Sequence, residues 1–453
     1  IIYIFSLILM KSVKVKTTNE ITNSNNETNP KIELVLSRSI IWYLLILISL
    51  NTAFLSMSPT ILQYSHRIIK FELKLSVQMY DWLITFYNFG SLLGAIIFTL
   101  VIERIKHKPI LISFLLINCL CHFSFYLKLS FLSLLISRFI SGLVTSFCFI
   151  YFPFWVDKFG INNWIGFMHA LVQIFKIYGM SLGAFLIYLV GQRKWNFGFI
   201  LESVSVTIVT FLMHLIPQAY YDKRYIDLER ENKIDINIEK VEKETFIKDI
   251  LLNVPFLLLQ FCRGKIMFIN QTIRYCYNSK YDFHIFKSDK ILIFHSYLFN
   301  TIFVSCLGII TGSLLLFMIG GQYSRYSFLL IFYLQLISCF LGFISNKNSS
   351  SVYFNIMICL FNYFNSASSI ISLIVSFAVM PKTLKDISCG VISIIVNLTG
   401  ILPAKKGYNL IKTYFGKQGT INVLMLYGMI GCFELIVADF YMKFNKIKLY
   451  QKY

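Results

Sequence analysis

The chain has 453 residues, of which 57% are hydrophobic and 14% are charged, and its formal net charge is +20. Soluble domains are closer to half apolar and a quarter charged, so this composition excludes an ordinary water-soluble enzyme. With 22 Gly and 8 Pro, the chain is neither collagen-like nor broadly disordered. The remaining class is a protein that crosses a lipid bilayer many times. At about 20 apolar residues per span, a chain of this length holds about twelve spans.

Apolar segments follow one another along the chain in two groups of six. The first group covers residues 40–59, 82–102, 109–126, 130–153, 164–190 and 195–216, and the second covers 250–272, 291–319, 328–344, 352–380, 387–402 and 421–440. A charged stretch, residues 220–249, separates the two groups. Two parallel six-span halves are typical of secondary transporters. We therefore predict an all-α integral membrane fold with twelve transmembrane helices in two pseudo-symmetric six-helix halves.

The expected organisation has five segments. They are a disordered tail over 1–38, a six-helix half over 39–217, a charged linker over 218–249, a second half over 250–442 and a basic tail over 443–453. Met10 precedes the polar part of the tail and is expected to be the true start, the alternative for residues 1–9 being a vestigial signal segment. Loops on the side of the two tails carry more Lys and Arg, so both termini are expected in the cytosol.

Signatures of catalysis and of metal binding are missing from the sequence. The ten Cys are scattered without a CxxC pair, and neither a P-loop nor an HExxH motif occurs. We therefore expect no enzyme activity, no metal and no cofactor. The basic residues flank apolar segments as membrane topology requires, so nucleic acid is not an expected partner.

The loop between the second and third spans combines a carboxylate with several cations. Glu103, Arg104 and Lys108 lie there within six residues. Such a cluster can pair with charges on neighbouring helices and latch one face of a helix bundle. The simpler alternative is that the cations only flank the membrane on its positive side.

At this loop the chain resembles the major facilitator superfamily, whose signature is a Gly, three residues, Asp-Arg and then a Gly-Arg-Lys-like turn. Glu103 takes the Asp position, Arg104 the Arg position, and His107 and Lys108 the basic pair, whereas Thr99 replaces the first Gly. The resemblance implies a transporter that works by alternating access, with a substrate site between its halves near the middle of the bilayer.

Further motifs extend the resemblance along the chain. Arg138 and Gly142 match the family's Arg-xxx-Gly in the fourth span, and Asp157 ends that span where it is expected to pair with Arg104. In the second half the loop signature is degraded, because Phe317 occupies the expected Asp position. Residues 398–407 are similar to a motif of spinster-like and organic-anion-transporting members.

Pairs of glycines separated by three residues let helix backbones approach closely, and we interpret them as helix-packing residues. Together with Gly142, they are Gly90, Gly94, Gly179, Gly183, Gly308 and Gly312.

Charged and polar residues inside the spans are the candidates for binding. A charge at the middle of a bilayer is costly, so it usually faces a cavity or a partner. The candidates are Arg138, His169, Gln173, Lys176, Arg263, Lys265, Asn362 and Asn365. Because cations predominate, we expect a cavity that attracts an anion. The alternatives are snorkelling of the lysines towards an interface and a structural bond for Arg138.

Two carboxylates, Glu202 and Glu434, lie inside the sixth and twelfth spans. Either is a candidate proton site, because burial favours the neutral form of a carboxyl group. The family geometry places these two spans on the outside of the bundle, so structural roles are favoured for both.

The expected function is facilitated or ion-coupled transport of a small anionic or zwitterionic organic solute by a monomer in the bilayer. One alternative is a spinster-like exporter of lysolipids or sphingolipids, for which the high Phe content of the chain is suitable. The other is a membrane receptor or scaffold without transport, because the loop signatures are degraded.

Overall fold

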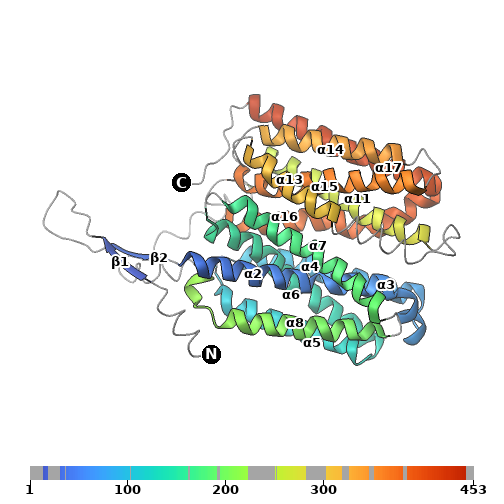
Figure 1. Ribbon diagram of the computed structural model, residues 1–453. Coiled ribbons are helices and arrows are strands. Elements are labelled where there is room, and N and C mark those ends of the chain that lie inside the picture. Colours follow the sequence, from blue (N-terminus) through green and yellow to red (C-terminus); the bar gives the residue numbers. More distant parts are fainter. Residues whose placement is uncertain are drawn as a thin grey trace.

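The computed structural model describes residues 14–18, 31–35, 37–102, 104–161, 164–190, 194–222, 250, 252–281, 303–318, 326–345, 351–380 and 385–444. In Figure 1 two groups of helices lie side by side with their axes in the same general direction. The first helix begins, and the last helix ends, at one end of the molecule, which we call the terminal face. The other end is the opposite face.

Helices of the N-terminal half are α2 (Arg38–Leu55), α3 (Met57–Glu72), α4 (Val77–Val101), α5 (His107–Tyr126), α6 (Phe131–Phe159), α7 (Ile165–Val190) and α8 (Trp195–His214). The C-terminal half contains α11 (Val254–Tyr281), α13 (Ser305–Met318), α14 (Tyr326–Ser345), α15 (Ser351–Val379), α16 (Lys385–Val396), the π-helical turn η6 (Asn397–Ile401) and α17 (Leu402–Phe444). Within the described ranges, ten helices are long and apolar enough to cross a membrane, and α13 is a shorter apolar helix.

Each of the twelve predicted spans contains a described helix or part of one, which confirms the predicted fold class. Several helices extend beyond the predicted boundaries. The first span continues through a turn at Ser56 into α3, whose last residue Glu72 accepts hydrogen bonds from Lys128 Nζ at 2.7 Å and Trp195 Nε1 at 3.0 Å. These contacts hold the polar C-terminal end of α3, which the apolar pattern of the sequence does not include in the first span.

The eleventh span also exceeds its predicted end at residue 402. Pro403 lacks a backbone N–H and would normally break a helix, but the wider π turn of η6 directly precedes it and lets the helix continue. Gly416 then adopts a left-handed conformation with φ 66°, which interrupts α17 and separates the last two spans.

Two short strands lie within the tail that the sequence predicts to be disordered. β1 (Lys14–Thr18) and β2 (Lys31–Val35) pair antiparallel, with Lys14 opposite Val35. The remaining described part of the chain is helical or forms turns.

A short segment that follows α8 is fixed to the N-terminal half at the terminal face. It includes the 3-10 turn η3 (Gln218–Tyr220), whose Tyr220 carbonyl accepts a hydrogen bond from Trp155 Nε1 at 2.8 Å. Tyr151 donates its hydroxyl hydrogen to the Tyr221 carbonyl at 2.9 Å. The first residues of the predicted linker therefore belong structurally to the N-terminal half.

Close helix contacts form where the paired glycines lie. A Cβ added to Gly90 would lie 2.0 Å from the Phe139 carbonyl oxygen, and one added to Gly142 would lie 2.0 Å from that of Tyr87, so α4 and α6 touch backbone to backbone. A Cβ added to Gly179 of α7 would lie 1.8 Å from the carbonyl oxygen of Ala53 of α2. The other glycines of the pairs also meet a neighbouring backbone: Gly94, Gly183, Gly308 and Gly312.

Replacing Gly179 with Ala should destabilise the protein, because its Cβ would overlap the α2 backbone. Overpacking of this kind costs about 1–3 kcal/mol, which thermal unfolding in detergent would show as a lower Tm. Gly166→Ala on the same helix is the matched control, since its Cβ would lie 3.6 Å from its nearest neighbour, Ser313 Oγ. Equal melting of the two variants would contradict this packing.

Candidate functional site

A cavity of about 410 Å³ lies between the two halves. The end of α2 and helices α3, α4, α6 and α7 line it from the N-terminal half, and α11, α13, α15, α16 and η6 line it from the C-terminal half. Near the terminal face the halves touch closely, for example where a Cβ on Gly390 of α16 would lie 1.9 Å from Thr99 Oγ1 of α4. Near the opposite face, an ion pair between Asp81 and Lys405 joins them.

Among the described residues that line this cavity, the charged ones are all cations: Arg138, Lys176 and Arg263. The described lining contains neither Asp nor Glu. Hydroxyl groups and seven side-chain amides supply the remaining hydrogen-bonding capacity, and the amides are Gln63, Asn88, Gln173, Asn270, Gln271, Asn362 and Asn397. The cavity therefore combines positive charge with groups that can both donate and accept hydrogen bonds.

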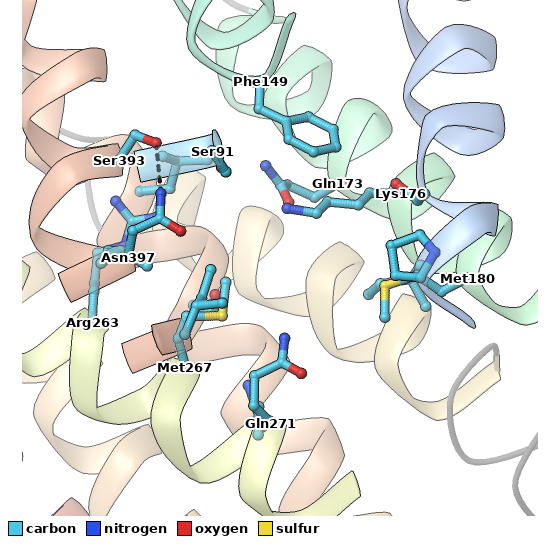
Figure 2. Close-up of a pocket in the computed structure, with 18 of the residues that line it drawn as sticks. Ser91, Phe149, Gln173, Lys176, Met180, Arg263, Met267, Gln271, Ser393 and Asn397 are labelled. Atoms are coloured by element: carbon cyan, nitrogen blue, oxygen red, sulfur yellow. Dashed lines mark hydrogen bonds between the residues drawn. The ribbon is translucent and has the colours of Figure 1, made fainter. Parts of the chain in front are cut away.

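Arg263 forms the cationic wall of the C-terminal half. Its Nη1 donates to Gln260 Oε1 at 3.3 Å, and Gln260 in turn donates from Nε2 to Ser376 Oγ at 2.8 Å. These two bonds hold one edge of the guanidinium and leave the others for the cavity. Figure 2 shows Arg263 beside Asn397, whose Nδ2 donates to Ser393 Oγ at 3.4 Å.

Two glycines bring Arg263 and Asn397 together. A Cβ on Gly264 would lie 1.8 Å from Thr399 Oγ1, and one on Gly400 would lie 2.6 Å from the Gly264 carbonyl oxygen. The bare backbones of α11 and η6 therefore cross in direct contact, and the residues next to this crossing reach the same part of the cavity.

Lys176 forms the cationic wall of the N-terminal half. In Figure 2 it lies with Gln173 across the cavity from Arg263. Its Nζ lies 4.7 Å from the centre of the Phe149 ring, which is a cation–π contact at the cavity wall.

Arg138 borders the cavity from α6 and is only 1% exposed. Its guanidinium packs over the Tyr87 ring at 4.3 Å from the ring centre. Its Nε and Nη1 have no hydrogen-bond partner among the described residues. A buried guanidinium with unsatisfied donors is costly, so this residue is suited to a ligand that supplies acceptors.

Five of the eight binding candidates from the sequence line the cavity: Arg138, Gln173, Lys176, Arg263 and Asn362. Their role in binding stays a prediction. The structure places the other three elsewhere, which corrects their expected positions. His169 stacks on Phe377 of the C-terminal half at 5.3 Å, and Asn365 donates to Asn270 Oδ1 at 2.5 Å from behind the cavity wall.

Lys265 is the third candidate that lies away from the cavity. Its ammonium group forms an ion pair with Glu434 of α17, inside the C-terminal half. Positions two residues apart on a helix point in nearly opposite directions, so Arg263 faces the cavity while Lys265 faces α17. The pair also gives Glu434 a local partner, which is the structural role favoured for it.

The predicted latch is only partly visible. Glu103 lies outside the described residues. Arg104 is exposed, and no ion pair joins its guanidinium to the buried Asp157 in the described part of the chain, so their expected pairing is not seen. Lys108 instead donates from Nζ to the Ile216 carbonyl oxygen at 2.6 Å, and His107 Nδ1 lies 3.4 Å from Asp222 Oδ2. This basic pair therefore holds the segment that follows α8.

Several cavity residues escaped the sequence analysis. Asn88 and Asn397 are single amides in apolar spans, and Asn270 is followed only by Gln271, so neither charge nor spacing marks them. One sequence signal for this site lies next to Asn397, where Gly400 and Pro403 interrupt an apolar run. In the structure, residues 397–401 of this run form the π turn. π turns inside helices are frequent at functional sites.

A family model described as Major Facilitator Superfamily matches residues 40–404. The chain belongs to this superfamily. Among curated proteins, no sequence matches the chain. The superfamily and its solved structures indicate a multi-pass membrane protein for transmembrane transport rather than an enzyme.

Solved transporters of the superfamily share the fold at low sequence identity. The proton:xylose symporter XylE, bound to 6-bromo-6-deoxy-D-glucose, has a TM-score of 0.67 at 11% identity, over 90% of this chain and 96% of its own. A bacterial homologue of the human lysosomal transporter Spinster, inward-facing and unoccupied, has 0.63 at 12% identity, over 92% and 100%. The fucose:proton symporter FucP of E. coli has 0.61 at 12%, over 88% and 99%.

The ion pair between Lys265 and Glu434 can be tested by mutation, because it distinguishes a charge paired inside the C-terminal half from one that faces the cavity. Lys265→Met or Glu434→Met alone should lower the Tm strongly, because each leaves an uncompensated charge inside the membrane. Such losses are about 3–5 kcal/mol, whereas the double variant leaves two apolar side chains and should be more stable than either single variant. Additive losses in this double-mutant cycle would show that the two groups do not interact.

Proposed function

We propose that this chain transports a small organic anion by alternating access, as a monomer. The observation that carries the proposal is the charge of the cavity, where Arg138, Lys176 and Arg263 face a volume without a described carboxylate. The cations come from both halves, so one bound anion would contact both moving parts of the protein. A cavity of about 410 Å³ is within the range that holds small-molecule ligands.

The residues that line the cavity favour an anion over a zwitterion and over a lipid with an acyl chain. A zwitterion would need a negative charge opposite its cationic group, and the described lining contains no carboxylate. An acyl chain would meet seven amide side chains, although a bacterial Spinster homologue shares the fold. A cavity lined from both halves also supports transport rather than a scaffold role.

We also propose that the terminal face lies in the cytosol. The support is the excess of Lys and Arg in the loops on the side of the two tails. Labelling of a single cysteine introduced at Lys443, at the end of α17, in intact cells would test this orientation. Labelling by a membrane-impermeant reagent would contradict it.

Neutral variants of the cavity cations should lose anion affinity. Hydrogen bonds to charged groups are worth about 1.5–3 kcal/mol, so Arg263→Gln and Lys176→Gln should each weaken binding by about ten- to a hundredfold. The measurement is a thermal-shift titration of the purified protein with inorganic phosphate, citrate, benzoate and uncharged sugars, followed by uptake of any stabilising anion into liposomes.

Lys443→Gln is the matched control, because it removes the same charge from an exposed position at the end of α17. It should bind as the unaltered protein does. Stabilisation by sugars or organic cations, with no anion active, would overturn the proposed substrate class.

A further inference from the structure

A buried pair of ionisable side chains lies inside the N-terminal half, beside Arg138 and away from the cavity. Glu202 of α8 is fully buried, and His122 of α5 is 1% exposed. His122 Nδ1 lies 3.2 Å from Glu202 Oε1. Neither carboxylate oxygen has another hydrogen-bond partner among the described residues.

Hydrogen bonds around His122 fix where its protons lie. Ser141 donates its only hydroxyl hydrogen to Asn118 Oδ1 at 2.6 Å, so its oxygen can only accept from His122 Nε2, at 3.3 Å. Nε2 therefore carries a hydrogen. The remaining nitrogen, Nδ1, and the carboxylate oxygen are both acceptors unless one of them is protonated. Their separation of 3.2 Å is favourable only with a proton between them.

Few other charges act on this pair. Arg138 is the described cation that interacts electrostatically with Glu202, and Tyr87 of α4 and Cys119 of α5 interact with it as well. Tyr80 and Cys121 act on Arg138 itself. Of the other helices packed on α8, α3 brings Glu72, which accepts from Trp195 Nε1 at the far end of α8 and pairs with Lys128, and α2 brings the neutral Asn51 at Met213.

We propose that the His122–Glu202 pair is the binding site of a coupling proton, and that this proton sets how much positive charge Arg138 offers to the cavity. With the proton bound, the pair is neutral and the charge of Arg138 is uncompensated. Without it, the pair carries one negative charge, which compensates Arg138 through the low-dielectric interior. An anion in the cavity and a proton on the pair therefore favour each other.

The proposal rests on the proposed anion transport and specifies its ion coupling. Linkage requires that proton binding and anion binding strengthen each other by the same factor. For one proton, the anion dissociation constant should rise up to tenfold for each pH unit over which the pair loses its proton. The anion and the proton would then cross the membrane together.

Glu202→Gln is the central variant, because an amide has the shape of the protonated carboxyl group and no charge. Binding of the tightest anion among phosphate, citrate and benzoate would be measured by thermal shift from about pH 5 to about pH 9. The unaltered protein should bind more weakly as the pH rises. Glu202→Gln should keep only the pH dependence that the ionisation of the anion itself causes, which is negligible for benzoate over this range. His122→Asn should move the pH midpoint without abolishing the dependence.

Glu434→Gln is the matched control, since Glu434 is the other carboxylate inside a span and pairs with Lys265 instead. It should keep the pH dependence of the unaltered protein. A Glu202→Gln variant that also keeps this dependence would overturn the proposal.

An infrared titration of the purified protein tests the proton site independently of the proposed substrate class. Difference spectra between acidic and alkaline pH should contain a carboxyl or imidazolium signal that Glu202→Gln removes and Glu434→Gln retains. If no anion binds but this signal is present, the proton site stands and the proposed substrate class fails. If no signal depends on Glu202, the proton site fails whatever binds in the cavity.

Discussion

The absence of water inside a bilayer is the constraint on which this structure depends. A charged side chain at that depth must find a partner or face a cavity, because an isolated charge is too costly. The protein uses both solutions on one helix: Lys265 pairs with Glu434, whereas Arg263 faces the cavity, held at one edge by Gln260. The cations Arg138, Lys176 and Arg263 therefore all border the cavity.

Backbone proximity gives these charges their positions. Glycine at the crossings of α4 with α6, of α2 with α7 and of α13 with α15 removes the side chains that would hold the helices apart. The crossing at Gly264 and Gly400 acts on the site directly, because Arg263 and Asn397 are set by it. A change in helix packing at this crossing would consequently change the shape of the cavity.

Sequence patterns predicted the fold well because hydropathy and glycine spacing are local signals. They placed all twelve spans and identified Arg138, Lys176 and Arg263 as intramembrane cations. They could not show which way each charge points, since the direction depends on helix rotation within the bundle. That is why Lys265 was expected in the cavity, and why the partnership of Glu202 with His122, across two helices, was not foreseen.

The placement of Lys176 and Arg263 on opposite walls has a consequence for the empty carrier. Like charges from two bodies that must approach each other repel, and the repulsion grows as the space between them narrows and loses water. An unloaded protein would therefore resist closing, whereas a bound anion would act as an electrostatic bridge. Under the proposed transport of an anion, such an arrangement would discourage futile cycling, because the halves would reorient freely only while they carry cargo.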